Sequence, residues 1–120
     1  MTDFHPTSIL CMIGSRQWND IDRIRDFLQS TRDQWYSIVT GTAFGADSIV
    51  HAVCNELDIP CHTVFAKWWN ENCDHTRNQE LFDMADEIII LWDGRSSSTQ
   101  RAIALAHEQY PHKPKLVWCL

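Results

Sequence analysis

Two short loops contain the residues that are best suited to chemistry. The first is Gly14-Ser15-Arg16, which directly follows an apolar run over residues 9–13. The second, residues 40–47, reads Thr-Gly-Thr-Ala-Phe-Gly-Ala-Asp and follows an apolar run over residues 36–39. Each loop precedes a helical pattern, so free backbone N–H groups are expected at two helix N-termini. Such groups bind phosphate, and two such loops in one small domain indicate a nucleotide-like ligand.

The second loop has small residues and a carboxylate at a spacing that suits a ligand. Gly41 and Gly45 permit tight turns and a close approach of the backbone to a ligand, with Thr42 and Ala43 between them. Asp47 is expected to N-cap the following helix. The same residues also suit a capped turn that binds nothing, and both interpretations stay open.

A third loop, residues 93–99, is rich in hydroxyl groups and precedes another helical pattern. Hydroxyls and the N–H groups of a helix start can cradle a phosphate or a ribose oxygen. A flexible capped loop is the alternative. The candidate ligand-binding residues of this loop are Asp93, Ser96, Ser97, Ser98 and Thr99.

Charged and aromatic side chains near these loops are suited to complete a nucleotide site. Arg16, Lys67 and Arg77 supply positive charge, and an arginine fork matches a phosphate bidentately. Aromatic faces can stack on a base. The alternatives are solvated surface charges and tryptophans that cover the rim of the core. The candidates for base stacking are Trp18, Trp68 and Trp69.

Short apolar runs alternate with helical patterns along the chain. The runs are continuous, which is typical of parallel strands buried on both faces. This predicts a single α/β domain over residues 1–120, a three-layer Rossmann-like domain with a five-stranded parallel sheet. Ligands of such sheets bind at the carboxyl ends of the strands, where the three loops fall. The expected strands are residues 8–13, 35–40, 61–65, 87–92 and 115–120, and the expected helices are residues 20–31, 47–57, 76–84 and 99–108.

Composition disfavours several classes of protein. No apolar run reaches the length of a membrane helix and no signal peptide opens the sequence, so a cytoplasmic protein is expected. A net charge of −6 disfavours a protein that wraps nucleic acid. The five cysteines lack a Cys-x-x-Cys pair, which indicates reduced thiols. Cys61-His62 and Cys73-Asp74-His75 lack zinc-knuckle spacing, so no metal is expected.

The motifs and their order resemble one known family. They are Gly14-Ser15-Arg16, the 40–47 loop, Arg77-Asn78, Ala85-Asp86 before an apolar run, and Asp93-Gly94 with Ser96 and Thr99 opening a helix. Together, over about residues 9–118, they resemble the SLOG superfamily and in particular its small YspA or DUF2493-type branch. Relatives in this superfamily include the lonely-guy phosphoribohydrolases, the DNA-processing protein and sensor domains for ADP-ribose-type signals.

The resemblance implies a Rossmann-like domain that binds nucleotide derivatives. The family's ligand loops map onto residues 14–16, 41–47, 77–78 and 96–99. Thr42 and Ser98 stand where the family usually has glycine, which narrows the room for phosphate. The phosphoribohydrolase relatives carry a glutamate three residues after the motif threonine, and Ala102 stands there in this chain. The carboxylate for that hydrolysis is therefore missing unless Glu71, Glu80 or Asp93 substitutes for it.

These observations predict a sensor or sequestering protein for a nucleotide-derived small molecule, such as ADP-ribose or a nucleoside phosphate. No resident cofactor is expected. Two alternatives stay open, an N-glycosidic hydrolase of nucleoside phosphates and a single-stranded nucleic-acid binder. The net negative charge counts against the second alternative, and Ala102 counts against the first. The six tryptophans leave room for a homo-oligomer.

Overall fold

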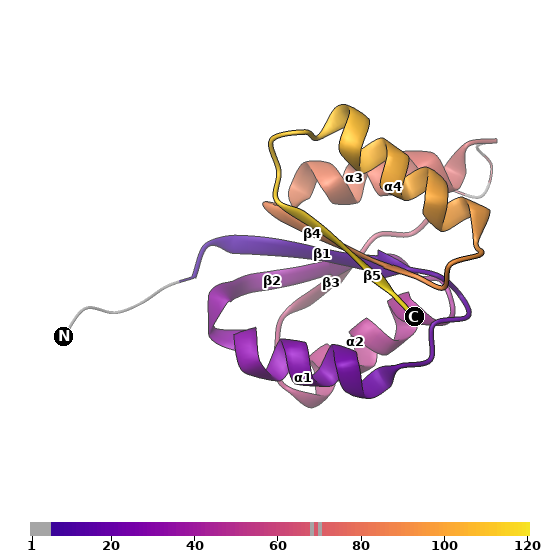
Figure 1. The fold of residues 1–120 in the computed structure, drawn as a ribbon. Helices are drawn as coiled ribbons and strands as arrows, with labels where there is room; N and C mark the ends of the chain where they lie inside the picture. The colour runs from indigo at the N-terminus through magenta and orange to yellow at the C-terminus, as the bar shows by residue number, and fades with distance from the viewer. Residues whose placement is uncertain (1–5, 68, 70) are drawn as a thin grey trace.

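The computed structural model describes residues 6–67, 69 and 71–120, and over these residues one parallel sheet of five strands forms the centre of the fold (Figure 1). The strand order is β3-β2-β1-β4-β5, and each neighbouring pair is parallel. This confirms the predicted α/β class and the predicted number of strands. The strands are β1 (Ser8–Gly14), β2 (Trp35–Thr40), β3 (Cys61–Thr63), β4 (Glu87–Trp92) and β5 (Lys115–Cys119).

Helices cover both faces of the sheet. In Figure 1, α1 and α2 lie on one face and α3 and α4 lie on the other. A 3-10 turn, η1 (Arg32–Gln34), links α1 to β2. Parallel strands need such crossovers, and the two pairs lie on opposite faces because the chain reverses its direction across the sheet after β3. The helices are α1 (Ile21–Thr31), α2 (Ala46–Glu56), α3 (Cys73–Met84) and α4 (Ser97–Gln109).

The central strand β1 is buried on both sides. Leu10 and Met12 belong to the core beneath α1 and α2, whereas Cys11 and Ile13 belong to the core beneath α3 and α4. Successive side chains of a strand point to opposite faces, so a strand between two helical layers must be apolar at every position. This is the physical reason for the unbroken apolar run from which the strand was predicted.

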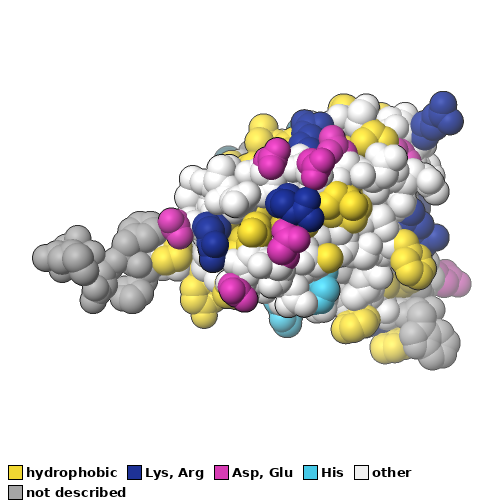
Figure 2. All heavy atoms as spheres, turned by 90° about the horizontal axis from the view of Figure 1, so that it is seen from below, with side chains coloured by type: hydrophobic (Ala, Val, Ile, Leu, Met, Phe, Trp, Pro, Cys, Tyr) yellow, Lys and Arg dark blue, Asp and Glu magenta, His cyan; other side chains and the backbone are white. Residues whose placement is uncertain are grey.

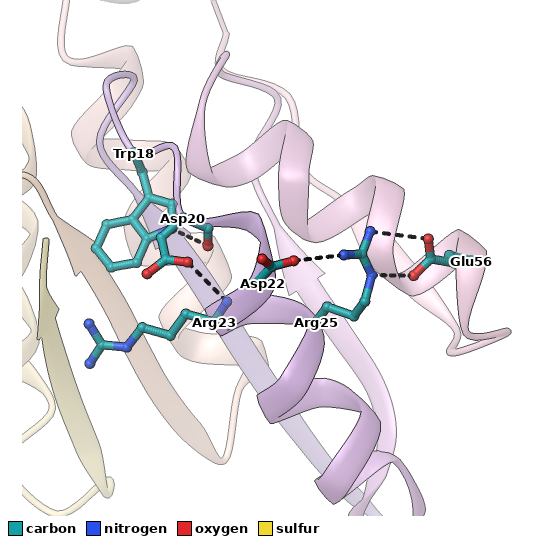
Figure 3. A network of polar contacts seen from close by, with 6 residues as sticks. All are labelled: Trp18, Asp20, Asp22, Arg23, Arg25 and Glu56. Atoms are coloured by element: carbon teal, nitrogen blue, oxygen red, sulfur yellow. Dashed lines mark hydrogen bonds and ion pairs between the residues drawn. The ribbon is translucent and has the colours of Figure 1, made fainter.

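The first helix is tied to its neighbours by polar contacts at its surface (Figure 3). Arg25 bridges α1 to α2 through two hydrogen bonds to Glu56, at 2.6 and 3.2 Å, and also contacts Asp22 at 3.1 Å. The Arg25 guanidinium lowers the pKa of Glu56. Asp20 caps α1 by accepting a hydrogen bond from the Arg23 backbone N–H at 3.1 Å. The Asp20 cap fixes the start of α1 at Ile21, and the Arg25–Glu56 contact ties this helix to α2.

Most predicted boundaries fall within one residue of those observed, and three differ by two residues or more. Helix α2 begins at Ala46, one residue before the predicted start, because Gly45 adopts a positive φ of 82° and turns the chain into the helix. The third strand ends at Thr63 rather than residue 65. Helix α3 begins at Cys73 rather than residue 76, and α4 begins at Ser97 rather than Thr99. The first turns of both helices are polar, so the spacing of apolar residues did not show where these helices begin.

The carboxyl ends of β1 and β4 form the switch point of the sheet. These strands are neighbours, but the chain leaves β1 toward α1 on one face and leaves β4 toward α4 on the other (Figure 1). A crevice between two diverging loops is the usual ligand position in open α/β sheets. The first and third candidate loops follow these two strands.

Candidate functional site

The end of β1 and the loop after it pack directly against β4 and the loop that follows β4. A Cβ on Gly14 would lie 2.2 Å from the Leu91 carbonyl oxygen, so only glycine permits this approach of β1 to β4. The Ser15 side chain is 1% exposed, and its hydroxyl lies 3.0 Å from the Thr99 hydroxyl. The same hydroxyl accepts a hydrogen bond from the Asp93 backbone N–H at 3.1 Å. Ser15 therefore joins the first loop to the third and is buried beneath the site.

The carboxylate of Asp47 occupies the centre of the second loop. It is 1% exposed and accepts hydrogen bonds from the backbone N–H groups of Gly14, at 3.2 Å, and Ala43, at 3.3 Å. The predicted N-cap role was wrong: Asp47 lies inside the first turn of α2, where Gly45 is the cap residue. Burial raises the pKa of Asp47, and the nearby Arg77 opposes that shift.

Arg77 is the counter-charge of Asp47. Its Nη1 lies 3.8 Å from Asp47 Oδ2, and its Nη2 donates to Asn78 Oδ1 at 3.1 Å. The side chain is 11% exposed, and its Nε is buried without a partner among the described residues. A guanidinium held by a single carboxylate in this way keeps donor capacity for a further anion.

A side chain at Gly41 or Gly45 would collide with neighbouring atoms of the protein itself. A Cβ on Gly41 would lie 2.5 Å from Asp47 Oδ2 and 2.8 Å from Arg77 Nη1. A Cβ on Gly45 would lie 2.3 Å from the backbone oxygen of Arg16. The glycines of the second loop therefore permit the packing of the Asp47–Arg77 pair and of one loop on another. Close approach to a ligand is not what requires them in this structure.

The third loop is ordered by a carboxylate and a chain of hydroxyls. Asp93 Oδ1 accepts from the backbone N–H groups of Arg95, at 2.8 Å, and Ser96, at 2.7 Å, and these bonds lower the pKa of Asp93. The Ser96 hydroxyl contacts those of Ser98, at 3.1 Å, and Thr99, at 3.2 Å. The first N–H groups of α4 have no acceptor within their own helix, so this end of the helix favours an anion.

A small cavity of about 50 Å³ lies at this switch point. It has wall residues from all three loops, from α3 and from α4, and it combines two guanidinium groups with the first turn of a helix. This combination is chemically suited to an anion the size of a phosphate group. The cavity is lined by Ile13, Gly14, Arg16, Ala43, Asp74, Arg77, Asn78, Ser98, Thr99 and Ala102.

Other candidate residues lie beside this cavity rather than in its wall. Gly41, Thr42 and Asp47 line a second hollow of about 280 Å³, together with Ser48, His51, Thr63 and Phe65. Lys67 lies 3.6 Å from Glu80, with which it forms an ion pair. Ser97 is exposed, while Asp93, Ser96 and Ser15 support the loops from behind the wall.

The tryptophans differ in their placement. Trp18 is 2% exposed and packs in the core beneath α1, where its indole N–H donates to the Asp20 carbonyl at 3.1 Å (Figure 3). Its predicted role in base stacking was therefore wrong, and the alternative of a core residue holds. Trp69 is exposed, and Trp68 lies outside the described residues. Phe65, which is 72% exposed beside the larger hollow, offers an aromatic face that the sequence reading did not single out.

Asp74 is a residue of the cavity wall that was not predicted from the sequence. It lines the cavity from the first turn of α3, on the same helical face as Arg77 and Asn78. The i, i+3, i+4 spacing is present in the sequence, but the predicted helix began only at residue 76 and so left Asp74 outside it. Of the three carboxylates proposed as substitutes for the missing glutamate, Asp93 is held by its own loop and Glu80 pairs with Lys67. Glu71 is exposed and is absent from the cavity wall.

Protein-family models, curated proteins and solved structures gave no match to this chain. Within residues 6–67, 69 and 71–120, no three His, Cys, Asp or Glu side chains gather as a metal site. No helix of the described chain is both long and apolar enough to cross a membrane.

Proposed function

We propose that this chain binds a phosphate-bearing, nucleotide-derived small molecule at the switch point, as a sensor or sequestering protein. The observation that carries the proposal is the meeting of Arg16, Arg77 and the first turn of α4 around one cavity. Guanidinium forks and helix N-termini both favour phosphate, and here they converge where α/β sheets bind ligands. The resemblance to the SLOG superfamily points to the same class of ligand.

The sizes of the two spaces suggest how such a ligand would divide between them. A cavity of about 50 Å³ has room for a phosphate group and not for a whole nucleotide. The neighbouring hollow of about 280 Å³ is large enough for a sugar or a base and has Phe65 in its wall. Thr42 and Ala43 separate the two spaces, so a ligand that used both would pass over this loop.

A binding panel tests the proposal. The probes are inorganic phosphate, AMP, ADP and ADP-ribose, and adenosine is the matched control that lacks a phosphate. Binding is measured by thermal shift and then by calorimetry. The expected result is stabilisation by at least one phosphorylated probe and none by adenosine. A panel with no phosphate-dependent response would contradict the proposal.

Arg16→Ala is expected to weaken binding of the tightest phosphorylated probe by roughly tenfold to a hundredfold. Arg16 is exposed at the cavity mouth, and a hydrogen bond to a charged group contributes about 1.5–3 kcal/mol. Arg16→Lys should recover only part of the loss because an ammonium lacks the planar fork. Binding should also weaken as salt is added. Calorimetry at two salt concentrations measures these effects.

Arg32→Ala is the matched control for this prediction. Arg32 opens η1, which precedes β2 and so lies at the amino-terminal edge of the sheet, away from the cavity. Its replacement should leave affinity unchanged. Equal affinities of the wild type and Arg16→Ala would show that the first loop plays no part in binding.

The alternative of an N-glycosidic hydrolase is favoured by one observation, the carboxylate of Asp74 in the cavity wall. The position of the relatives' glutamate, Ala102, also faces this cavity and supplies no acid or base. We therefore expect no release of free base from AMP, GMP or CMP above background, measured by liquid chromatography. Release that Asp74→Asn abolishes, and that Glu80→Gln leaves intact, would favour the hydrolase over the sensor.

The nucleic-acid alternative has less support. The chain carries a net charge of −6, and the face seen in Figure 2 mixes acidic and basic side chains rather than presenting a basic stripe. Nucleic-acid binders neutralise phosphates with clustered Lys and Arg. A single-stranded oligonucleotide added to the binding panel tests this alternative, and we expect no binding at physiological salt.

A further inference from the structure

Two cysteines and a histidine meet at the edge of the sheet, apart from the switch-point cavity. His51 and Cys54 lie three residues apart on α2 and so share one helical face. Cys61 begins β3, which is one of the two edge strands of the sheet. Cys61 packs against the core cluster that contains Cys54.

The turn between α2 and β3 brings these cysteines together. The backbone N–H of Ile59 donates to the Cys54 carbonyl at 2.9 Å, which folds the chain back onto the end of the helix. Asp58, with a positive φ of 55°, makes the reversal. Cys61 follows two residues after Ile59, so its position beside Cys54 is fixed by backbone hydrogen bonding as well as by side-chain packing.

The two thiols differ in their access to solvent. Cys54 is fully buried, whereas Cys61 is half-buried and His51 is exposed. His51 lines the larger hollow together with Thr63, which lies on the same face of β3 as Cys61. Cys61 is therefore the thiol of this pair that a small reagent can reach, whereas Cys54 is shielded from solvent.

We propose that Cys61 is a thiol-oxidation site for hydroperoxides and that Cys54 is the resolving cysteine, giving an intramolecular disulfide between the two. Reactive redox cysteines combine access to solvent with a neighbouring second thiol, and this pair has both features. Hydrogen bonding from Cys54 and from His51 lowers the pKa of Cys61, which favours its thiolate. The disulfide would close a turn that the backbone already holds in place.

The chemistry balances with hydrogen peroxide as the oxidant. The Cys61 thiolate attacks one peroxide oxygen, an S–O bond forms, the O–O bond breaks, and the departing hydroxide takes up a proton to leave as water. The Cys54 sulfur then attacks the sulfenic sulfur of Cys61, so that the S–S bond forms and the S–O bond breaks. The Cys54 proton leaves with the expelled hydroxide. Two thiols and one peroxide thus give one disulfide and two waters.

Peptide mapping of the whole protein tests the product. Cleavage after Arg32 and Lys67 yields a peptide, residues 33–67, whose two cysteines are Cys54 and Cys61. After limited peroxide, this peptide should lose two hydrogen atoms and resist alkylation until it is reduced. Cys54→Ser should stop at a sulfenic acid that dimedone traps on Cys61, and Cys73→Ser should change nothing. Retention of both thiols in this peptide, while Cys119 oxidises, would overturn the proposal.

Alkylation rates of the unmodified protein give a second test that does not depend on how a variant folds. Cys119 is more exposed than Cys61, so simple access predicts that Cys119 reacts faster. The proposal predicts the reverse at neutral pH, with Cys61 on the order of tenfold faster with iodoacetamide, since the thiolate is the nucleophile. His51→Ala should raise the pH midpoint of Cys61 alkylation. Faster reaction at Cys119 would overturn the proposal, and neither test involves the proposed phosphate ligand.

Discussion

Asp47→Ala is expected to lower the free energy of unfolding by about 3–5 kcal/mol, the scale for removing one partner of a buried ion pair. Alanine leaves the backbone N–H groups of Gly14 and Ala43 without their acceptor. It also leaves the Arg77 guanidinium, now 3.8 Å from the carboxylate, without its counter-charge. Urea unfolding followed by circular dichroism measures the change.

Asp47→Asn separates the shape of this side chain from its charge. Asparagine keeps one oxygen acceptor, so its free energy of unfolding should fall by less, on the order of 1–3 kcal/mol at neutral pH. Equal stabilities of the wild type and Asp47→Ala would contradict the structural role assigned to this carboxylate.

The same variant tests a pH dependence. Burial, the largest effect on Asp47, raises its pKa above the unfolded value. The native state therefore gains stability from protonation that is complete below the unfolded pKa and is lost as the pH rises through the folded pKa. Asp47→Asn should remove this component from the stability profile between those two pKa values. Identical profiles for both proteins would show that Asp47 titrates normally.

The fold was predictable because its signals are local. A strand between two helical layers must be apolar at nearly every position, and residues 9–13 and 88–92 meet this requirement without reference to any partner. Alternation of such runs with helical patterns then leaves few topologies. The starts of α3 and α4 were not predictable in this way because their first turns are polar and are defined by backbone geometry.

The sequence predicted where on the sheet the site lies, but not how its side chains contact one another. Sequence placed Arg16, Ala43 and Thr99 at one sheet edge because their loops follow parallel strands, and all three line the cavity. It gave no sign that the Asp47 carboxylate is buried and hydrogen-bonded to the Gly14 backbone, or that Ser15 is buried. Both facts depend on contacts between loops that are 33 and 84 residues apart in the chain, which no local pattern encodes.

The exposure of the aromatic residues could not be predicted from the sequence either. A tryptophan after a glycine loop suits either a base or the core, and its type does not distinguish the two. Trp18 is buried in the core cluster that also contains Ile24 and Leu28 of α1. Phe65 is exposed because β3 ends at Thr63, earlier than its apolar pattern suggested. Exposure in each case depends on packing against other elements, which the residue type does not reveal.

Gly45→Ala is expected to lower the free energy of unfolding by about 2–5 kcal/mol, from two separate causes. A φ of 82° is costly for any residue with a Cβ, on the order of 1–3 kcal/mol. The new Cβ would also lie 2.3 Å from the Arg16 backbone oxygen, and overpacking of this kind costs about 1–3 kcal/mol. Because the clash involves backbone, a rotamer change does not relieve it.

Gly94→Ala isolates the first cause, the conformational cost of a positive φ. Gly94 has nearly the same φ, 83°, but no atom lies within 4 Å of the Cβ that alanine would add. Its substitution should therefore show the conformational cost alone, on the order of 1–3 kcal/mol. The difference between the two variants, measured by urea unfolding under identical conditions, reports the contact that holds the second loop against the first. If Gly45→Ala is no more destabilising than Gly94→Ala, the two loops are not packed as described, and the cavity that they enclose with α4 loses its structural basis.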